Sequence, residues 1–335
     1  MCTCFLVKAK DKSVVVGRTM EFGIDLQSKI SIFPREFKFQ GMGANNKPGF
    51  SWSSKYGFVG MDALGMPMVS DGMNEKGLYV GDLYLPGFAK YQDVPIGEEG
   101  NSISPLDVAG YLLSECENVE EAKQAISRVF VWPMFVPQIK SVAPLHFVVN
   151  DANGKSALFE YIDGKLNIHD NPVGVVTNSP YFDWHLINLR NYVNLSANNV
   201  PDLKLDGDDI MPIGQGSGML GLPGDATPPS RFVRAVALTQ SIVKAENVEE
   251  ATKNAFHILN NFDLPRGFAR ETREGQTVYD YTSWSTISDL TQKIYYYRGY
   301  DNFKVYGVKL SDLDFTGSQI RRLDTSNSDW FTPIS

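Results

Sequence analysis

The chain has 335 residues, and its composition of 43% hydrophobic and 12% aromatic residues excludes an intrinsically disordered protein. The net charge is −8, from 31 basic and 39 acidic residues, and this balance without a basic run excludes nucleic acid as an expected partner. No segment reaches the roughly 18 continuous apolar residues of a membrane span. The N-terminus alternates like a strand and not like a signal peptide, so we expect a cytoplasmic protein, or a periplasmic one if a leader has been trimmed.

The first 22 residues predict a β-hairpin. Residues 2–9 and 14–22 are rich in strand-forming side chains and flank a charged turn. If the tip lies in that turn, the hairpin places Cys2 opposite the end of the second strand, with Arg18 and Glu21 close to it. A shift of one residue in the pairing turns every side chain to the other face, so the sequence leaves open which of them points at the thiol.

Two pairs of helices are predicted, one in each half of the chain. The first helix begins at Ser104 as the N-cap, with Pro105 at N1 and Asp107 at N3. The string NVEEA opens the next helix at 118–122 and returns at 247–251, in both places after an apolar helical stretch. Each copy has an N-cap and acidic residues in the first turn, where the helix dipole favours them.

Segments rich in β-structure lie before, between and after these helix pairs. Residues 143–178 predict hairpins, and residues 277–310 return to strand patterns. Residues 188–228 form a long, polar loop rich in Gly and Pro, and loops of that length are typical of assembly or substrate binding. The order β, α pair, β, α pair, β predicts a layered sandwich with the sheets in the middle and the helix pairs outside.

Several familiar motifs carry no chemistry here. Residues 216–221 match the GxGxxG dinucleotide fingerprint, but no strand precedes them and no helix follows, so we expect no nucleotide cofactor. Cys2 and Cys4 alone are too few ligands for zinc, and the histidines lack metal-ligand spacing, so we expect no metal. A papain-like Cys–His pair stays open, although nothing singles out one of the four histidines, which are His146, His169, His185 and His257.

Cys2 directly follows the initiator methionine. Removal of Met1 leaves one residue that carries both a thiol and a free α-amine. An α-amine titrates near about pH 7.7–8.0 and can take the thiol proton at neutral pH, so nucleophile and base would share one residue without a histidine. The alternative is that Cys2 is a small buried residue that happens to stand early in the chain.

Ordered motifs along nearly the whole chain resemble the conjugated bile acid hydrolase and penicillin V acylase family, the choloylglycine hydrolases. They are MCT at 1–3, GRTME at 17–21, DGMNEKGL at 71–78, TNSP at 177–180, GLPGD at 221–225, SRFVR at 230–234 and YRGYDN at 297–302. The resemblance implies an N-terminal-nucleophile hydrolase of class α+β, with a four-layer αββα sandwich in a single domain over residues 1–335. It also implies a homotetramer that assembles through the 188–228 loop, no cofactor, and a small-molecule amide as substrate.

The resemblance further implies that Cys2 attacks the carbonyl of a linear, non-peptide amide and forms a thioester, which water then hydrolyses. Arg18 matches the family arginine that stabilises the thiolate, with a surface ion pair as the alternative. Asn178 matches the asparagine whose side-chain amide donates to the oxyanion. Arg231 matches a further arginine near the site, with structural pairing to a carboxylate as its alternative. Glu21 stands where the family generally has an aspartate that holds the α-amine, and it is one methylene longer.

Tyr84 bears on the choice of substrate. Its backbone N–H matches a family oxyanion donor, and family members that act on bile salts commonly carry asparagine here, whereas penicillin V acylases carry tyrosine. We therefore expect a penicillin V-like or other N-acyl amide slightly ahead of a glycine or taurine bile salt conjugate. Met20 and Phe22 offer an apolar wall to the acyl group, although both are equally compatible with the core. The alternatives are an N-acyl homoserine lactone acylase and a non-catalytic relative that binds acyl amides.

Overall fold

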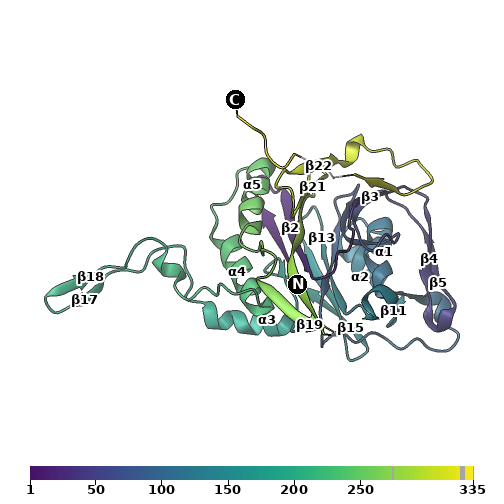
Figure 1. The fold of residues 1–335 in the computed structure, drawn as a ribbon, viewed down its shortest axis with the longest axis horizontal. Coiled ribbons are helices and arrows are strands. Elements are labelled where there is room, and N and C mark those ends of the chain that lie inside the picture. Colours follow the sequence, from purple (N-terminus) through teal and green to yellow (C-terminus); the bar gives the residue numbers. More distant parts are fainter. Residues whose placement is uncertain (274, 325–328, 335) are drawn as a thin grey trace.

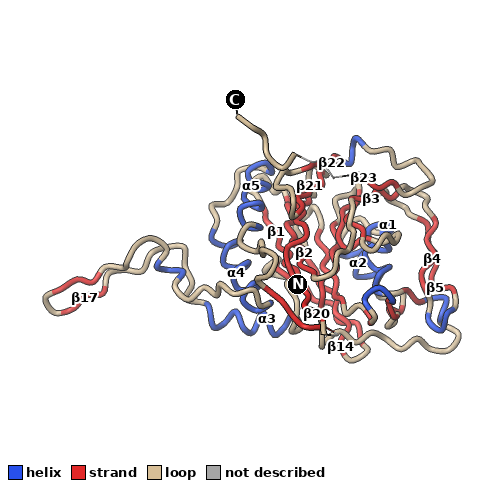
Figure 2. Tube along the Cα trace, viewed as in Figure 1, coloured by secondary structure: helices blue, strands red, loops and turns tan. Residues whose placement is uncertain are grey.

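Two antiparallel β-sheets pack face to face, and a pair of helices covers the outer face of each (Figure 1). The computed structural model describes residues 1–273, 275–324 and 329–334. Figure 2 shows the strands gathered in the middle of the molecule with the helices on either side. This is the layered sandwich that the order of elements predicts, with the four αββα layers that the family resemblance implies, and it puts two sheet faces in contact at the centre of the protein.

The first sheet contains the N-terminal hairpin. Its strands in spatial order are β16 (Val175–Val176), β1 (Cys2–Lys8), β2 (Val14–Phe22), β20 (Gln276–Asp289), β21 (Ile294–Gly299) and β22 (Tyr306–Lys309), with β19 (Ala269–Arg273) beside β20. As predicted, β1 and β2 pair, with Cys2 opposite Met20 and Cys4 opposite Arg18. These four side chains share the inner face of the sheet, because residues that are opposite or two apart point the same way.

The second sheet lies across from the first. Its strands in spatial order are β15 (Lys165–Asp170), β14 (Ser156–Ile162), β13 (Leu145–Asn150), β8 (Tyr79–Tyr84), β7 (Val69–Asn74), β6 (Phe58–Asp62), β3 (Ile30–Phe33) and β23 (Arg321–Leu323). Tyr79 of β8 contacts Cys4, and Ser70 of β7 accepts a hydrogen bond from Arg18, so β7 and β8 face the hairpin. The hairpins predicted within residues 143–178 are β13, β14 and β15.

Each outer face is covered by one of the predicted helix pairs. Helices α1 (Val108–Glu115) and α2 (Val119–Ile126) pack on the second sheet, and α4 (Pro228–Ser241) and α5 (Val248–Leu259) pack on the first. A 3-10 turn with the predicted Ser104–Asp107 capping box leads into α1. Asn118 and Asn247 cap α2 and α5, and each accepts a hydrogen bond from the backbone N–H three residues on, at 3.0 and 3.1 Å. None of the helices among the described residues has the length and apolarity that crossing a bilayer requires.

Shorter elements complete the fold. They are α3 (Phe182–Asn188) and the strand pairs β4 (Lys38–Met42) with β5 (Pro48–Ser53), β9 (Ser102–Ile103) with β10 (Phe130–Val131), and β11 (Phe135–Val136) with β12 (Ser141–Val142). Residues 193–226 form an arm that extends away from the sandwich (Figure 1). At its tip, β17 (Leu203–Leu205) and β18 (Asp208–Ile210) form a hairpin around Gly207, whose φ is 96°. The sequence shows few strand signals here, because the strands are three residues long and exposed.

The two asparagine caps predict similar and additive losses of stability. Asn118→Ala and Asn247→Ala each remove the side-chain acceptor of a first-turn N–H, so each should lower the free energy of unfolding by about 1 kcal/mol. The double variant should lose about 2 kcal/mol, since the two caps lie on opposite outer faces. Urea denaturation followed by circular dichroism measures the loss. Asn→Ser changes at both positions keep an acceptor and serve as controls, and an equal loss in these variants would contradict the capping role.

Candidate active site

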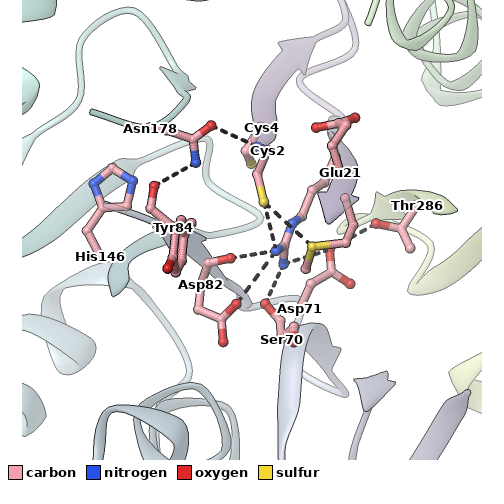
Figure 3. Close-up of polar contacts among 12 residues, drawn as sticks. Cys2, Cys4, Glu21, Ser70, Asp71, Asp82, Tyr84, His146, Asn178 and Thr286 are labelled. Carbon is pink, nitrogen blue, oxygen red and sulfur yellow. Dashed lines mark hydrogen bonds and ion pairs between the residues drawn. The ribbon is translucent and has the colours of Figure 1, made fainter. Parts of the chain in front are cut away.

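The sulfur of Cys2 lies between the sheets at the start of β1, and the residue is 2% exposed. Its Sγ is 3.7 Å from Nη2 of Arg18 and 3.7 Å from Sδ of Met20, the residue opposite it in the hairpin. Figure 3 shows the sulfur among these contacts. Arg18 therefore places a positive charge where a thiolate would carry its negative charge.

Arg18 is buried and is held by the second sheet. Its Nη1 donates to the carbonyl of Ser70, and its Nη2 donates to the carbonyl of Asp82 at 2.5 Å. The carboxylates of Asp71 and Asp82 lie 3.9 and 3.6 Å from the guanidinium nitrogens. Burial alone lowers the pKa of Arg18, but the negative charges around it, that of Cys2 foremost, raise it well above its usual value. The guanidinium is thus a permanent cation at the sulfur.

Asp71 anchors this arrangement with hydroxyl groups from both sheets. Its Oδ2 accepts hydrogen bonds from the hydroxyls of Tyr79 and Thr286, both at 2.9 Å, and its Oδ1 accepts one from the hydroxyl of Tyr295. The sequence places Asp71 in a family motif but predicts no function for it.

Within the described residues, no three His, Cys, Asp or Glu side chains are grouped so that they could hold a metal ion.

Cys4 shares a face with Cys2 but differs in its surroundings. Burial raises the pKa of Cys4 to about 12, although a hydrogen bond with Tyr79 and the charge of Arg18 lower it. The Sγ of Cys4 is 3.8 Å from the hydroxyl of Tyr79. Cys4 therefore stays a thiol at neutral pH, and Cys2 is the cysteine that borders a cavity.

Asn178 and Arg231 meet the backbone of Cys2. The Cys2 N–H donates to Oδ1 of Asn178 at 2.8 Å, and Nη2 of Arg231 donates to the same oxygen at 2.6 Å. This fixes the orientation of the amide, whose Nδ2 donates to the carbonyl of Tyr84 at 2.7 Å (Figure 3). Nη1 of Arg231 donates to the Cys2 carbonyl and, at 2.9 Å, to Oγ1 of Thr3. The structure thus brings Cys2, Arg18, Asn178, Arg231 and Tyr84 together in one place; the family resemblance named the last three as site residues.

Glu21 lies buried next to the N-terminus. Its Oε1 accepts a hydrogen bond from the hydroxyl of Thr282 at 2.9 Å, and its Oε2 is buried without a hydrogen-bond partner among the described residues. The amine of Met1 donates to the backbone carbonyl of Glu21. Burial raises the pKa of Glu21, while the charges of Arg231 and the N-terminus lower it. One carboxyl oxygen of Glu21 is thus unpaired among the described residues, and the carboxyl group interacts electrostatically with the charge of the chain terminus.

A small apolar cavity of about 80 Å³ opens beside Cys2. Met20 and Phe22, which the sequence predicts as acyl contacts, line it together with Tyr84. The rings of Phe22 and Tyr84 meet edge to face, with centroids 5.8 Å apart. A wider cleft of about 620 Å³ shares Phe22 and Tyr84 with this cavity and reaches Met1 and Asn178. An acyl group in the cavity would therefore leave the amine portion of a substrate in the cleft.

Two buried histidines support the segment that carries Asn178. Nδ1 of His146 is 2.9 Å from Oε1 of Glu160, and its Nε2 is 3.2 Å from the carbonyl oxygen of Thr177. Nε2 of His185 is 2.9 Å from the carbonyl oxygen of Asn178, and burial lowers the pKa of His185 to about 4, so it is neutral. These contacts hold the backbone at the asparagine, and none of them forms a Cys–His pair. Sequence reasoning missed them because they are isolated polar positions with no shared pattern.

The buried carboxyl group of Asp82 predicts a pH-dependent gain in stability on substitution. Burial raises the pKa of Asp82 to about 7, although the charge of Arg18 lowers it. Because this pKa is higher in the folded protein than in the unfolded chain, the folded state holds an extra proton between about pH 4 and pH 7. Stability contributed by this group is therefore lost as the pH rises through that interval.

Relative to the wild type, Asp82→Asn should gain free energy of unfolding progressively from about pH 4 to pH 8, by up to about 4 kcal/mol. Urea denaturation at a series of pH values measures the gain, with Asp93→Asn at an exposed position as the control. A gain in the free energy of unfolding that stays constant across this pH range would contradict the raised pKa of Asp82.

Comparison with known proteins identifies the family. Residues 2–327 match the sequence model of the linear amide C–N hydrolases, choloylglycine hydrolase family. The bile salt hydrolase/transferase of Clostridium perfringens (strain 13 / Type A) is 35% identical over 324 residues, which cover 96% of each chain. The penicillin V acylase of Pectobacterium atrosepticum is 28% identical over 332 residues, which cover 92% of this chain and 81% of that one.

Solved structures show the same fold. A mutant of the conjugated bile acid hydrolase from Clostridium perfringens superposes with a TM-score of 0.83 at 33% identity, over 97% of both chains. The penicillin V acylase from Agrobacterium tumefaciens has a TM-score of 0.78 at 28% identity, over 96% of this chain and 91% of that one. They confirm the predicted sandwich of the N-terminal-nucleophile hydrolases. The chain belongs to the choloylglycine hydrolase family and is an amidohydrolase that acts on linear amides.

Proposed function

We propose that Cys2, once Met1 is removed, cleaves a linear amide as an N-terminal nucleophile through a thioester acyl-enzyme. One observation carries this proposal. The sulfur of Cys2 is 3.7 Å from the cation of Arg18, while its backbone nitrogen is 2.8 Å from Oδ1 of Asn178. The two atoms that would serve as nucleophile and base are thus each held by a separate polar group.

The reaction begins with transfer of the thiol proton of Cys2 to its own α-amine. The thiolate, beside Arg18, attacks the carbonyl carbon and forms the C–S bond. We propose that Nδ2 of Asn178 and the backbone N–H of Tyr84 donate hydrogen bonds to the resulting oxyanion. The ammonium then gives its proton to the leaving nitrogen as the C–N bond breaks. Water, deprotonated by the same amine, attacks the thioester, releases the acid and restores the thiol.

Glu21 and Arg231 are proposed to position the amine. The buried Oε2 of Glu21 needs a donor, and an ammonium group on Cys2 would supply one. Arg231 fixes the Cys2 carbonyl and the side-chain oxygen of Asn178 at the same time. A glutamate is one methylene longer than the aspartate usual in the family, but it carries the same charge when ionised.

We propose a compact N-acyl group, such as phenoxyacetyl, as the preferred acyl portion. The cavity at Cys2 measures about 80 Å³, and Phe22 and Tyr84 give it aromatic walls, whereas sites for drug-sized ligands measure about 300–1,000 Å³. A conjugated bile salt is the second candidate, because the 35% identical relative is a bile salt hydrolase/transferase. Its steroid would require the cavity to widen toward the neighbouring cleft.

We propose that the chain forms one domain. We also propose that the arm at 193–226 contacts other subunits in an assembly. Its exposed apolar side chains are of the kind that an interface between subunits buries, and they include Val200, Leu203, Leu205, Ile210 and Ile213. The homotetramer stays a prediction from the family resemblance.

The mechanism predicts that activity depends on Cys2 and on its free amine. The intact mass of the active protein should lack Met1, because a chain that keeps Met1 has no α-amine on Cys2. Cys2→Ala should abolish turnover of every amide substrate, since no thioester can form. Mass spectrometry and an amide hydrolysis assay measure the two effects. Activity of Cys2→Ala above about a tenth of the wild type would rule out the mechanism.

Substrate choice can be decided by a parallel assay of four amides. We expect kcat/KM to be higher for penicillin V than for glycocholate or taurocholate, because a phenoxyacetyl group is much smaller than a steroid and requires less widening of the cavity at Cys2. An N-acyl homoserine lactone completes the panel. A bile salt conjugate that is cleaved faster than penicillin V would reverse the order of the two candidates.

A further inference from the structure

The apolar cavity beside Cys2 has one carboxyl group among the described residues that line it. It belongs to Asp82 on β8, whose side chain is 7% exposed. Oδ1 of Asp82 is 3.6 Å from Nη2 of Arg18, the same nitrogen that is 3.7 Å from the sulfur of Cys2. Cys2 and Asp82 are drawn close together in Figure 3. The carboxyl group is therefore near the place where the first carbons of a bound acyl group would lie.

Arg18 has a counter-ion other than Asp82. Asp71 lies 3.9 Å from the guanidinium and is fixed by three hydroxyl donors, and backbone carbonyls accept hydrogen bonds from both terminal nitrogens of Arg18. A second carboxyl group in apolar surroundings is costly to ionise, as the pKa of about 7 that burial gives Asp82 shows. Carboxyl groups of this kind in a cavity are candidates for a role in function.

We propose that Asp82 determines acyl specificity by accepting a hydrogen bond from a hydroxyl or ammonium group next to the scissile carbonyl. This inference rests on the proposed function, because it requires the acyl group to lie in the cavity at Cys2. The substrates it favours are amides of 2-hydroxy or 2-amino acids over amides of the corresponding unsubstituted acids.

The selectivity arises from desolvation. An acyl group that fills the cavity removes water from the carboxyl group of Asp82. A hydrocarbon acyl group forms no hydrogen bond to the carboxyl group. A donor on the carbon next to the carbonyl replaces the hydrogen bond that the carboxyl group made to water. Sites with a buried polar group reject ligands that leave the group unpaired, so one hydrogen bond to this carboxyl group should change kcat/KM about tenfold or more.

A purely electrostatic role of Asp82 on Arg18 makes a different prediction. It would alter the rate for every substrate by the same factor, because all of them react at the same sulfur. The ratio of kcat/KM between two acyl groups on one enzyme cancels any such common factor. This ratio therefore reports only on a contact between Asp82 and the acyl group.

Two substrates that differ by one hydroxyl test the proposal. They are the phenylacetyl and 2-hydroxy-2-phenylacetyl amides of the same aromatic amine, with each enantiomer of the latter assayed. The wild type should favour one hydroxy enantiomer about tenfold or more. Asp82→Leu should bring this ratio to about one or below, and Asp82→Asn should keep part of it, because its amide oxygen still accepts. A wild-type ratio near one, or an unchanged ratio in Asp82→Leu, overturns the proposal.

Binding to the Cys2→Ala variant separates this inference from the mechanism, because that variant cannot form a thioester. Titration calorimetry should give a Kd about tenfold lower for the hydroxy amide, and equal Kd values overturn the proposal. If the wild type cleaves neither amide while the Kd preference is present, the proposed function fails and the role of Asp82 stands.

Met68→Leu is the matched control. It is a volume-conserving change in the wall of the same cavity, so it should keep the kcat/KM ratio between the two amides. If Met68→Leu lowers the kcat/KM ratio as much as Asp82→Leu does, the proposal that Asp82 contacts the acyl group is overturned.

Discussion

The guanidinium of Arg18 is the group on which the whole site depends. A permanent cation between two sheets is costly unless hydrogen bonds and counter-charges compensate for lost water. The carbonyls of Ser70 and Asp82 and the carboxylate of Asp71 provide this compensation from the opposite sheet. Arg18 thereby ties the hairpin that carries Cys2 to the second sheet. The hydrogen bonds that link the two sheets at this point also hold the positive charge of Arg18 next to the sulfur of Cys2.

The register of the N-terminal hairpin decides whether this arrangement can form. With Cys2 opposite Met20, the sulfur and the guanidinium of Arg18 lie on the same inner face. A slip of one residue would turn Arg18 toward the outer helices, where none of its partners lie. The turn helps to fix the register, since Oδ1 of Asp11 accepts hydrogen bonds from the N–H and, at 2.5 Å, the hydroxyl of Ser13. A local turn therefore controls chemistry at the far end of the strand.

The range of a contact along the chain determines how well sequence reasoning can find it. The hairpin and the helix caps depend on neighbouring residues, and the structure confirms both. Asn178 and Arg231 are 176 and 229 positions from Cys2, and only the family resemblance named them. Asp71 and Asp82 were missed as partners of the site, because no local pattern tells which buried acid of one sheet will face an arginine of the other. The histidines behind Asn178 were missed for the same reason.

Removal of Met1 moves the terminal positive charge by one residue, and this changes what Arg231 and Glu21 do. With Met1 attached, the nitrogen of Cys2 is a neutral amide that donates to Asn178. As a terminal amine it would stand beside the guanidinium of Arg231, and a neighbouring cation disfavours protonation of an amine. Glu21 acts in the opposite direction, with a carboxyl group whose own pKa is raised by burial. The balance between these two charges would decide how readily the amine takes a proton from the thiol and returns it to the leaving group.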